Sequence, residues 1–230
     1  MSSKSVAILV AAGRGERMGG GRPKAFLTLD GRSLLERAAE AFEATPEVEA
    51  IVAVVPSGEQ ETARKMLGAI TKLTTVVVGG ARRQDSVRAG LGALPPGFDG
   101  VVLVHDAARP LVEPALISAV ARAAAERGAA IPVLPLVDTI KRIEGGTVRG
   151  TLDRSGLGAA QTPQGVRRAL LEEALARAGE EVDLTDEAMA VERLGRPVAA
   201  VPGSVRNLKI TTPHDLRWAE QLLASGIERP

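Results

Sequence analysis

The sequence contains no cysteine, which excludes disulfide bonds and cysteine metal ligands. With only two histidines, His105 and His214, a zinc site is not expected. Aromatic residues make up 2% of the chain, too few for the exposed stacking platforms on which single-stranded nucleic acids bind. The 29 basic and 28 acidic residues leave a formal net charge of +1, so no broad electropositive surface for nucleic acid or membrane is expected.

Long apolar runs are also missing. No run approaches the roughly 20 residues that a membrane-spanning helix needs. The start of the chain (MSSKS) is too short and polar to begin a secretion signal. The sequence therefore predicts a cytoplasmic protein that binds no membrane.

Short apolar segments alternate along the chain with helical patterns. The 230 residues can bury a sizeable core and are expected to form one domain over 1–230. Continuous apolar strands that alternate with helices are typical of a mostly parallel, Rossmann-like α/β sheet flanked by helices. Strands are predicted at residues 6–10, 50–55, 75–78, 101–104, 130–134, 198–201 and 207–210. Helices are predicted at residues 33–44, 59–67, 86–93, 114–127, 166–178, 185–194 and 212–224.

Residues 138–158 interrupt this alternation. Polar and apolar residues alternate over 138–143 and again over 147–152, and Gly145 and Gly146 mark a hairpin turn between them. We therefore expect a protruding β-hairpin arm. An isolated hairpin is marginally stable in water, so this one is expected to pack on a second subunit or on its own domain.

Residues 10–24 follow the first predicted strand and are rich in glycine and cations. Glycine lets backbone N–H groups approach a ligand, so this loop is typical of a site for a polyanion such as a nucleoside triphosphate. Two phosphate motifs do not fit: Met18 replaces the third glycine of a dinucleotide fingerprint, and Ala25 replaces the Ser or Thr that follows a Walker lysine. Taken alone, the loop fits a basic surface segment without a ligand equally well. Its cationic residues are Arg14, Arg17, Arg22 and Lys24.

Two charged residues farther along the chain suit a phosphate site. Asp106 directly follows an apolar strand, where a carboxylate facing a phosphate loop is placed to hold Mg²⁺, although a turn or helix-capping role is the alternative. Lys209 follows an apolar position before the last helix, and an inward lysine there is costly unless it faces an anion. His105 is expected to be a buried structural histidine, and His214 to be structural at a helix start.

Eight segments carry a family resemblance by their order and spacing. They are 11–18 (AAGRGERM) with Pro23 and Lys24, 79–87 (GGARRQDSV), 105–110 (HDAARP), 138–141 (DTIK), 152–157 (LDRSGL), 161–164 (QTPQ), 185–188 (TDEA) and 207–211 (NLKIT). Together they resemble the 2-C-methyl-D-erythritol 4-phosphate cytidylyltransferases, a family of the nucleotidyltransferase (glycosyltransferase-A-like) superfamily. The resemblance covers nearly the whole chain.

The resemblance implies a reaction between CTP and methylerythritol 4-phosphate, a polyol phosphate, that gives 4-diphosphocytidyl-2-C-methylerythritol and pyrophosphate in non-mevalonate isoprenoid synthesis. Mg²⁺ or another divalent cation is the implied cofactor, held with the help of Asp106. The implied catalytic residues, which neutralise phosphate charge, are Arg17, Lys24 and Lys209. The implied nucleotide-binding residues are Ala11, Ala12, Gly13, Gly80 and Ser86. The implied residues for the methylerythritol phosphate are Arg109, Thr139, Arg154, Thr162 and Thr185.

The resemblance also implies a homodimer in which the arm reaches the other subunit, so that Thr139 and Arg154 serve the partner's site. Two positions depart from the family pattern. Ala25 stands where glutamine is frequent, and Ala81 stands where a polar residue is frequent. These departures put details of nucleotide contact in question, but they leave the reaction class unchanged.

Two alternatives stay open at this point. One is a cytidylyltransferase for another polyol phosphate such as ribitol 5-phosphate, whose nucleotide half would look the same. The other is a catalytically silent nucleotide-binding module. Such a module would not need Lys24, Asp106 and Lys209 together, and the sequence has all three.

Overall fold

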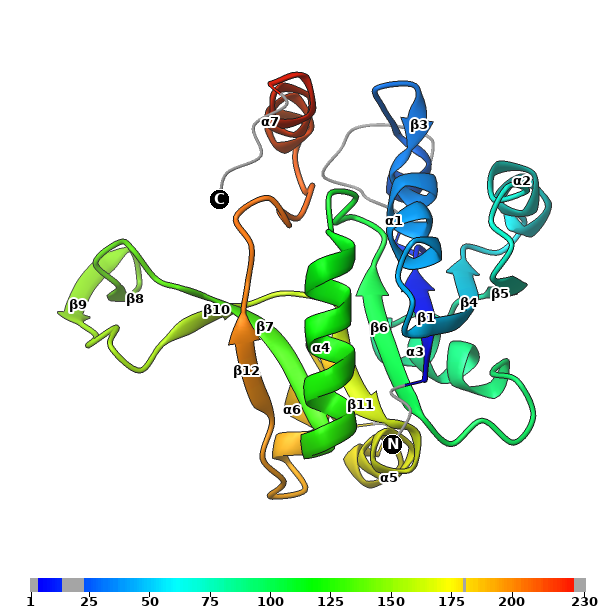
Figure 1. Ribbon diagram of the computed structural model, residues 1–230. Coiled ribbons are helices and arrows are strands. Elements are labelled where there is room, and N and C mark those ends of the chain that lie inside the picture. Colours follow the sequence, from blue (N-terminus) through cyan, green and yellow to red (C-terminus); the bar gives the residue numbers. More distant parts are fainter. Residues whose placement is uncertain (1–3, 14–22, 180, 226–230) are drawn as a thin grey trace.

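The chain is built around one large sheet (Figure 1). The computed structural model describes residues 4–13, 23–179 and 181–225. Within them the sheet has eight strands in the order β10-β7-β11-β6-β1-β4-β5, with β12 paired to β7. The strands are β1 (Ser5–Val10), β4 (Val48–Val55), β5 (Leu73–Val78), β6 (Val101–Asp106), β7 (Ala129–Pro135), β10 (Gly158–Ala160), β11 (Gln164–Arg167) and β12 (Ala199–Pro202).

Most neighbouring strands run in parallel, which confirms the predicted fold class. β1 pairs in parallel with β4 and β6, β4 with β5, and β12 with β7. The exceptions are β11, which runs antiparallel between β6 and β7, and β10, which runs antiparallel to β7. The carboxyl ends of β1, β4, β5 and β6 therefore share one edge of the sheet.

Helices cover both faces of the sheet. They are α1 (Leu34–Glu43), α2 (Gln60–Met66), α3 (Arg83–Gly92), α4 (Pro114–Arg127), α5 (Arg168–Ala178), α6 (Glu187–Glu192) and α7 (Pro213–Ala224). Alternate residues of β1 point to opposite faces: Ala7 and Leu9 pack with α1, α2 and α4, whereas Val6 and Ile8 pack with α3, α5 and α6. Burying a side chain such as Leu9 or Ile8 stabilises the folded state by about 1.5–3 kcal/mol, so packing on both faces of the sheet contributes to stability.

Two predicted helix starts are confirmed. The Ser33 hydroxyl accepts the backbone N–H of Glu36, and the Glu36 carboxylate accepts the N–H of Ser33. Thr212 and Asp215 form the same reciprocal pair at the start of α7, with Pro213 in its first turn. Both are capping boxes, which satisfy N–H groups that the first helical turn leaves without partners.

One predicted element is wrong, and another begins two residues later than predicted. Residues 207–210 form no strand. The Ile210 N–H donates a hydrogen bond to the Ala108 carbonyl oxygen, and the Ile210 side chain packs in a separate apolar cluster with Leu29 and Leu34. The helix predicted at 166–178 begins at Arg168, because Val166 belongs to β11. In both cases short apolar segments have no decisive periodicity, and long-range packing determines their conformation.

The predicted hairpin arm is present. β8 (Lys141–Glu144) and β9 (Thr147–Thr151) pair antiparallel across Gly145 and Gly146, whose φ values of 55° and 75° favour glycine. A smaller hairpin, β2 (Thr28–Leu29) and β3 (Arg32–Ser33), was not predicted. Figure 1 shows the arm extending away from the sheet and its helices. No helix in the described part of the chain is both long and apolar enough to cross a membrane.

Candidate functional site

A pocket of about 210 Å³ lies at the carboxyl edge of the sheet. β1 and β6 are neighbours with Val10 paired to Asp106, so the chain that leaves β1 runs beside the Asp106 carboxylate. Ala25 and Ala81, the two departures from the family pattern, also line this pocket. Eight predicted site residues line it as well: Ala11, Ala12, Gly13, Lys24, Gly80, Ser86, Asp106 and Lys209.

Gly80 lines the pocket, and neither it nor the preceding Gly79 has room for a side chain. A Cβ on Gly79 would lie 2.4 Å from the Ala12 Cβ, and a Cβ on Gly80 would lie 2.4 Å from the Asp85 Cβ. The Ser86 hydroxyl accepts a hydrogen bond from the Gly80 N–H at 3.2 Å. Both positions therefore favour glycine, and Gly80 brings bare backbone to the pocket beside the start of α3.

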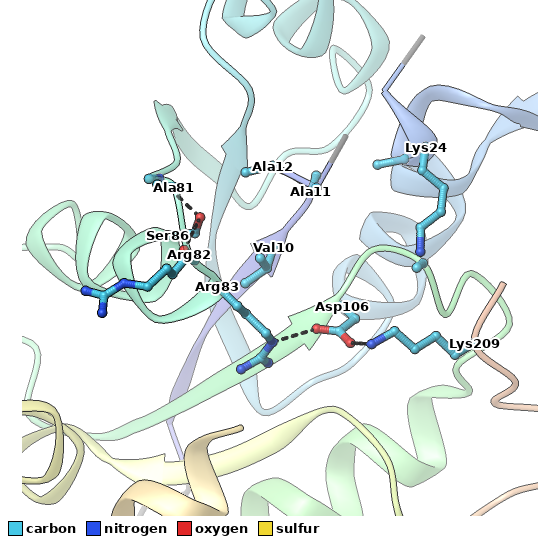
Figure 2. Close-up of a pocket in the computed structure, with 14 residues that line it drawn as sticks. Val10, Ala11, Ala12, Lys24, Ala81, Arg82, Arg83, Ser86, Asp106 and Lys209 are labelled. Atoms are coloured by element: carbon cyan, nitrogen blue, oxygen red, sulfur yellow. Dashed lines mark hydrogen bonds and ion pairs between the residues drawn. The ribbon is translucent and has the colours of Figure 1, made fainter. Parts of the chain in front are cut away.

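Asp106 lies between two cations, and Figure 2 shows both contacts. Its Oδ1 is 3.1 Å from Arg83 Nε, and its Oδ2 is 2.7 Å from Lys209 Nζ. Burial opposes ionisation of this carboxyl, but Arg83 and Lys209 prevail and hold the pKa of Asp106 well below its ordinary value. Figure 2 also shows the Lys24 side chain extending toward the side of the pocket that holds Asp106 and Lys209. The pocket thus gathers positive charge around one carboxylate.

Arg83 and Glu187 form a second, deeper ion pair that the sequence analysis did not single out. Arg83 Nη1 and Nη2 donate to the two carboxylate oxygens of Glu187 at 2.7 and 2.9 Å. Burial acts against the Arg83 charge, yet Glu187 and Asp106 together raise the pKa of its guanidinium above the ordinary value. Both residues lie in segments that carry the family resemblance, but 104 positions separate them, so no local pattern pairs them.

Lys209 is positioned by side-chain amides and not by a strand. Asn207 is fully buried and donates from Nδ2 to the Thr162 carbonyl oxygen at 2.7 Å. Gln161 donates from Nε2 to the Ser204 carbonyl oxygen at 2.9 Å and accepts the Ser204 N–H at 3.1 Å. These bonds, with the Ile210 contact to Ala108, fix the segment before α7 and so place Lys209 over the pocket.

The side-chain amide of Gln164 fixes the start of α6 by hydrogen bonds. Its Oε1 accepts the N–H groups of Glu187 and Ala188, each at 2.9 Å, and its Nε2 donates to Asp186 Oδ2 at 2.9 Å. Asp186, and not Thr185, is the N-cap of this helix, which runs over Glu187–Glu192 instead of the predicted 185–194. The segment 161–164 therefore connects three parts of the site: the Lys209 segment, Asp106 and α6.

His105 is a buried structural histidine, as predicted. Its Nε2 donates to the Arg109 carbonyl oxygen at 3.1 Å, which leaves Nδ1 to accept the Thr162 hydroxyl at 3.1 Å. The same hydroxyl accepts the backbone N–H of Asp106 at 3.1 Å. Burial lowers the pKa of His105 to about 4, so the ring is neutral at pH 7. His214 lies exposed in the first turn of α7.

The other predicted site residues that the structure describes do not line the pocket. Thr162 is buried with its hydroxyl engaged as above, and Arg109 donates to the Asn207 carbonyl oxygen at 2.7 Å. Thr185 is exposed beside α6. Thr139 and Arg154 are exposed on the arm, where Arg154 contacts the Val137 carbonyl oxygen. Arg17, Arg14 and Arg22 lie outside the described residues. The catalytic role of Arg17 and the substrate roles of Arg109, Thr139, Arg154, Thr162 and Thr185 stay predictions.

Bare glycine backbone and clustered cations at the carboxyl edge of a mostly parallel sheet define a nucleotide-binding α/β protein. Comparison with known families refines this class. Residues 5–225 match the model of the family described as "IspD: 2-C-methyl-D-erythritol 4-phosphate cytidylyltransferase", and the chain belongs to this family of nucleotidyltransferases.

Individual relatives agree with this assignment. The chain is 48% identical to the 2-C-methyl-D-erythritol 4-phosphate cytidylyltransferase of Nocardia farcinica over 95% of this chain and 93% of that protein. It is also 46% identical to the bifunctional enzyme IspD/IspF of Anaeromyxobacter dehalogenans. That alignment covers 96% of this chain and 58% of the longer protein, so the chain spans little more than half of that relative. The solved 2-C-methyl-D-erythritol 4-phosphate cytidylyltransferase of Thermus thermophilus superposes with a TM-score of 0.77 at 38% identity, covering 96% of this chain and 99% of that one.

Proposed function

We propose that the chain transfers the cytidylyl group of CTP to 2-C-methyl-D-erythritol 4-phosphate. The observation that carries the proposal is the meeting of Lys24, Asp106 and Lys209 in one pocket beside glycine backbone. The family match over residues 5–225 gives the substrates of the proposal. The cytoplasmic location expected from the sequence is part of the same proposal.

In this reaction a phosphate oxygen of the polyol phosphate attacks the α-phosphorus of CTP. A new phosphorus–oxygen bond forms as the bond between the α-phosphorus and the bridging oxygen to the β-phosphorus breaks, and pyrophosphate leaves with the electron pair. Such a transfer needs alignment and charge neutralisation more than covalent help from the protein. Lys24 and Lys209 would neutralise charge on the α-phosphate and the leaving group, while the backbone of Ala11, Gly13 and Gly80 would hold the nucleotide.

A divalent cation such as Mg²⁺ fits this pocket as a companion of the triphosphate. Asp106 offers oxygen ligands, and the described residues contain no group of three acidic or histidine side chains that could form a complete metal site. One carboxylate plus substrate phosphates is a common Mg²⁺ arrangement, and the bound cation would neutralise charge along the triphosphate. We therefore assign Asp106 as the protein ligand for a cation that enters with CTP.

The polyol phosphate would bind next to the nucleotide, at Arg109, Thr139, Arg154, Thr162 and Thr185. Arg109 supports this placement because its Nε is buried without a hydrogen-bond partner among the described residues. The arm supports a homodimer because it exposes large apolar side chains: Ile143 is 63% exposed and Val148 58%. Thr139 and Arg154 would then complete the pocket of the other subunit.

The test is a substrate panel in which pyrophosphate release is measured. CTP with methylerythritol 4-phosphate should turn over fastest, and neither CTP alone nor UTP or ATP with the same acceptor should match it. Faster turnover with ribitol 5-phosphate would favour the other polyol phosphate. No turnover with any pair, despite CTP binding, would favour the silent nucleotide-binding module.

A further inference from the structure

Four charged side chains of alternating sign form a continuous row through the site. Glu187 of α6 pairs with Arg83 of α3, Arg83 pairs with Asp106 at the end of β6, and Asp106 pairs with Lys209 before α7. The distances along the row are 2.7, 3.1 and 2.7 Å. Two acids and two bases balance, so the row is neutral although it runs from the pocket into the interior.

The two cations on Asp106 are held differently. The side chain of Arg83 is 23% exposed, and its guanidinium is gripped from the far side by both oxygens of Glu187, itself 3% exposed. Glu187 is fixed in turn, because Gln164 accepts its backbone N–H. The side chain of Lys209 is 42% exposed at the mouth of the pocket. Planar, bidentate pairs hold their geometry better than a single ammonium contact, so Arg83 is the fixed partner and Lys209 the exchangeable one.

We propose that Glu187 is a positioning residue that clamps Arg83 against Oδ1 of Asp106 and thereby keeps Oδ2 as the oxygen available to a divalent cation. When the cation arrives with the triphosphate, Lys209 leaves Oδ2 and turns to the phosphates, while Arg83 stays in place. The inference rests on the proposed metal role of Asp106 and deepens it. It gives a function to the buried Glu187 carboxylate, which contacts Arg83 and lies two places from Asp106 in the row.

Removing the Glu187 charge should weaken metal binding without touching the metal ligand. In Glu187→Gln the carboxylate that grips Arg83 becomes a neutral amide, and Arg83 keeps Asp106 as its charged partner. With Asp106 as its remaining anionic partner, the Arg83 guanidinium should pair with both Asp106 oxygens. It would then compete with the incoming cation for Oδ2. The replacement keeps the size and one acceptor oxygen of the original side chain, so the packing around α6 is disturbed little.

The test is a titration of the full chain with Mn²⁺, followed by electron spin resonance, in the presence of a CTP analogue with a methylene bridge between the α- and β-phosphates. Glu187→Gln should bind Mn²⁺ on the order of tenfold more weakly than the wild type, as is typical when a group behind a metal ligand is removed. Glu187→Asp, which keeps the charge, should recover part of the loss. Glu172→Gln is the matched control, since Glu172 pairs with Arg168 on the surface of α5 and should leave the affinity unchanged.

The decisive comparison measures the effect of Glu187→Gln in the wild type and again in a variant that already carries Arg83→Gln. Because Glu187 acts through Arg83, adding Glu187→Gln to Arg83→Gln should cause no further loss of Mn²⁺ affinity. An equal loss in both backgrounds, or wild-type affinity in a folded Glu187→Gln variant, would overturn the proposal. If Glu187→Gln does not fold, Arg83→Lys replaces it: a lysine cannot grip both carboxylates as a fork, so unchanged Mn²⁺ affinity in that variant would also overturn the proposal.

Failure of the metal assignment itself is recognised separately. The wild type should bind Mn²⁺ with the analogue, and Asp106→Asn should lose that binding. If Asp106→Asn binds Mn²⁺ as the wild type does, Asp106 is not the ligand and the role of Glu187 fails with it. If Asp106→Asn loses binding while Glu187→Gln keeps it, the metal site stands and the positioning role alone is refuted.

Discussion

The pocket and the arm are built in opposite ways. Around the pocket, charged and amide side chains are buried and bonded to one another, as with Asp106 between Arg83 and Lys209. The arm between residues 138 and 158 instead exposes apolar side chains such as Ile143 and Val148, and its two strands pair only with each other among the described residues. The charged side chains of the pocket therefore find partners within their own chain, whereas the arm exposes an apolar surface that a second subunit could cover.

The largest effect should follow from removing the arm. Deleting residues 139–151 takes away both strands of the hairpin with Thr139, so we expect loss of the dimer and loss of activity together. Sedimentation and pyrophosphate release, measured on the same preparation, check both outcomes. A monomer with full activity would show that the arm is not shared between sites.

Next in size is the loss of a pocket cation. Lys24→Ala should lower turnover on the order of a hundredfold or more, because charge that develops on the phosphates loses a fixed positive partner. The kcat for CTP and methylerythritol 4-phosphate measures this loss. Lys65→Ala on the exposed side of α2 is the control and should keep wild-type turnover. If Lys24→Ala turns over at the same rate as this control, Lys24 has no catalytic role.

A smaller change separates the arm surface from the arm backbone. Replacing Ile143 and Val148 together by serine removes apolar area that is exposed in the single chain, so the subunit should fold as before while the dimer weakens on the order of tenfold or more. Dimer dissociation measured by sedimentation over a range of concentrations tests this. Val205→Ser removes an apolar side chain that is 76% exposed outside the arm and serves as the control. Equal dimer affinity in all three proteins would place the interface elsewhere.

The last prediction concerns how the free energy of unfolding depends on pH. Burial lowers the pKa of His105 to about 4, so below pH ~6.5 the unfolded chain binds a proton that the folded chain refuses. The free energy of unfolding should therefore fall as the pH drops from about 6.5 toward 4, by about 1.4 kcal/mol per pH unit at most from this group.

Denaturant unfolding at several pH values checks this slope. His105→Gln should be less stable at pH 7 but should have a flatter dependence over the same window. His214→Gln removes the other histidine, whose exposed ring meets water in both states, and should keep the wild-type slope. A wild-type slope in His105→Gln would mean that other groups cause the acid sensitivity.

Features set by neighbouring residues could be predicted from the sequence, whereas contacts between distant residues could not. Strand ends are local features, so Asp106 could be expected to face the loop that begins at residue 11, and the hairpin followed from Gly145 and Gly146. The place of Gly80 in the site came from the family resemblance. The pair of Arg83 and Glu187 could not be predicted, because it joins α3 to α6 across 104 positions. Equally, β11 and the segment around Asn207 depend on partners supplied by distant residues, which periodicity does not record. The division of the chain into one domain with an excursion stays a prediction.

If the pocket of one subunit works with the arm of the other, two variants with different defects should complement each other when mixed. Lys24→Ala damages the pocket and Arg154→Ala damages the arm, so each variant alone should be nearly inactive. After subunit exchange in equal amounts, about a quarter of wild-type pyrophosphate release should return, because half of the dimers are mixed and each holds one intact site. A mixture no more active than the two variants measured separately would contradict the shared site.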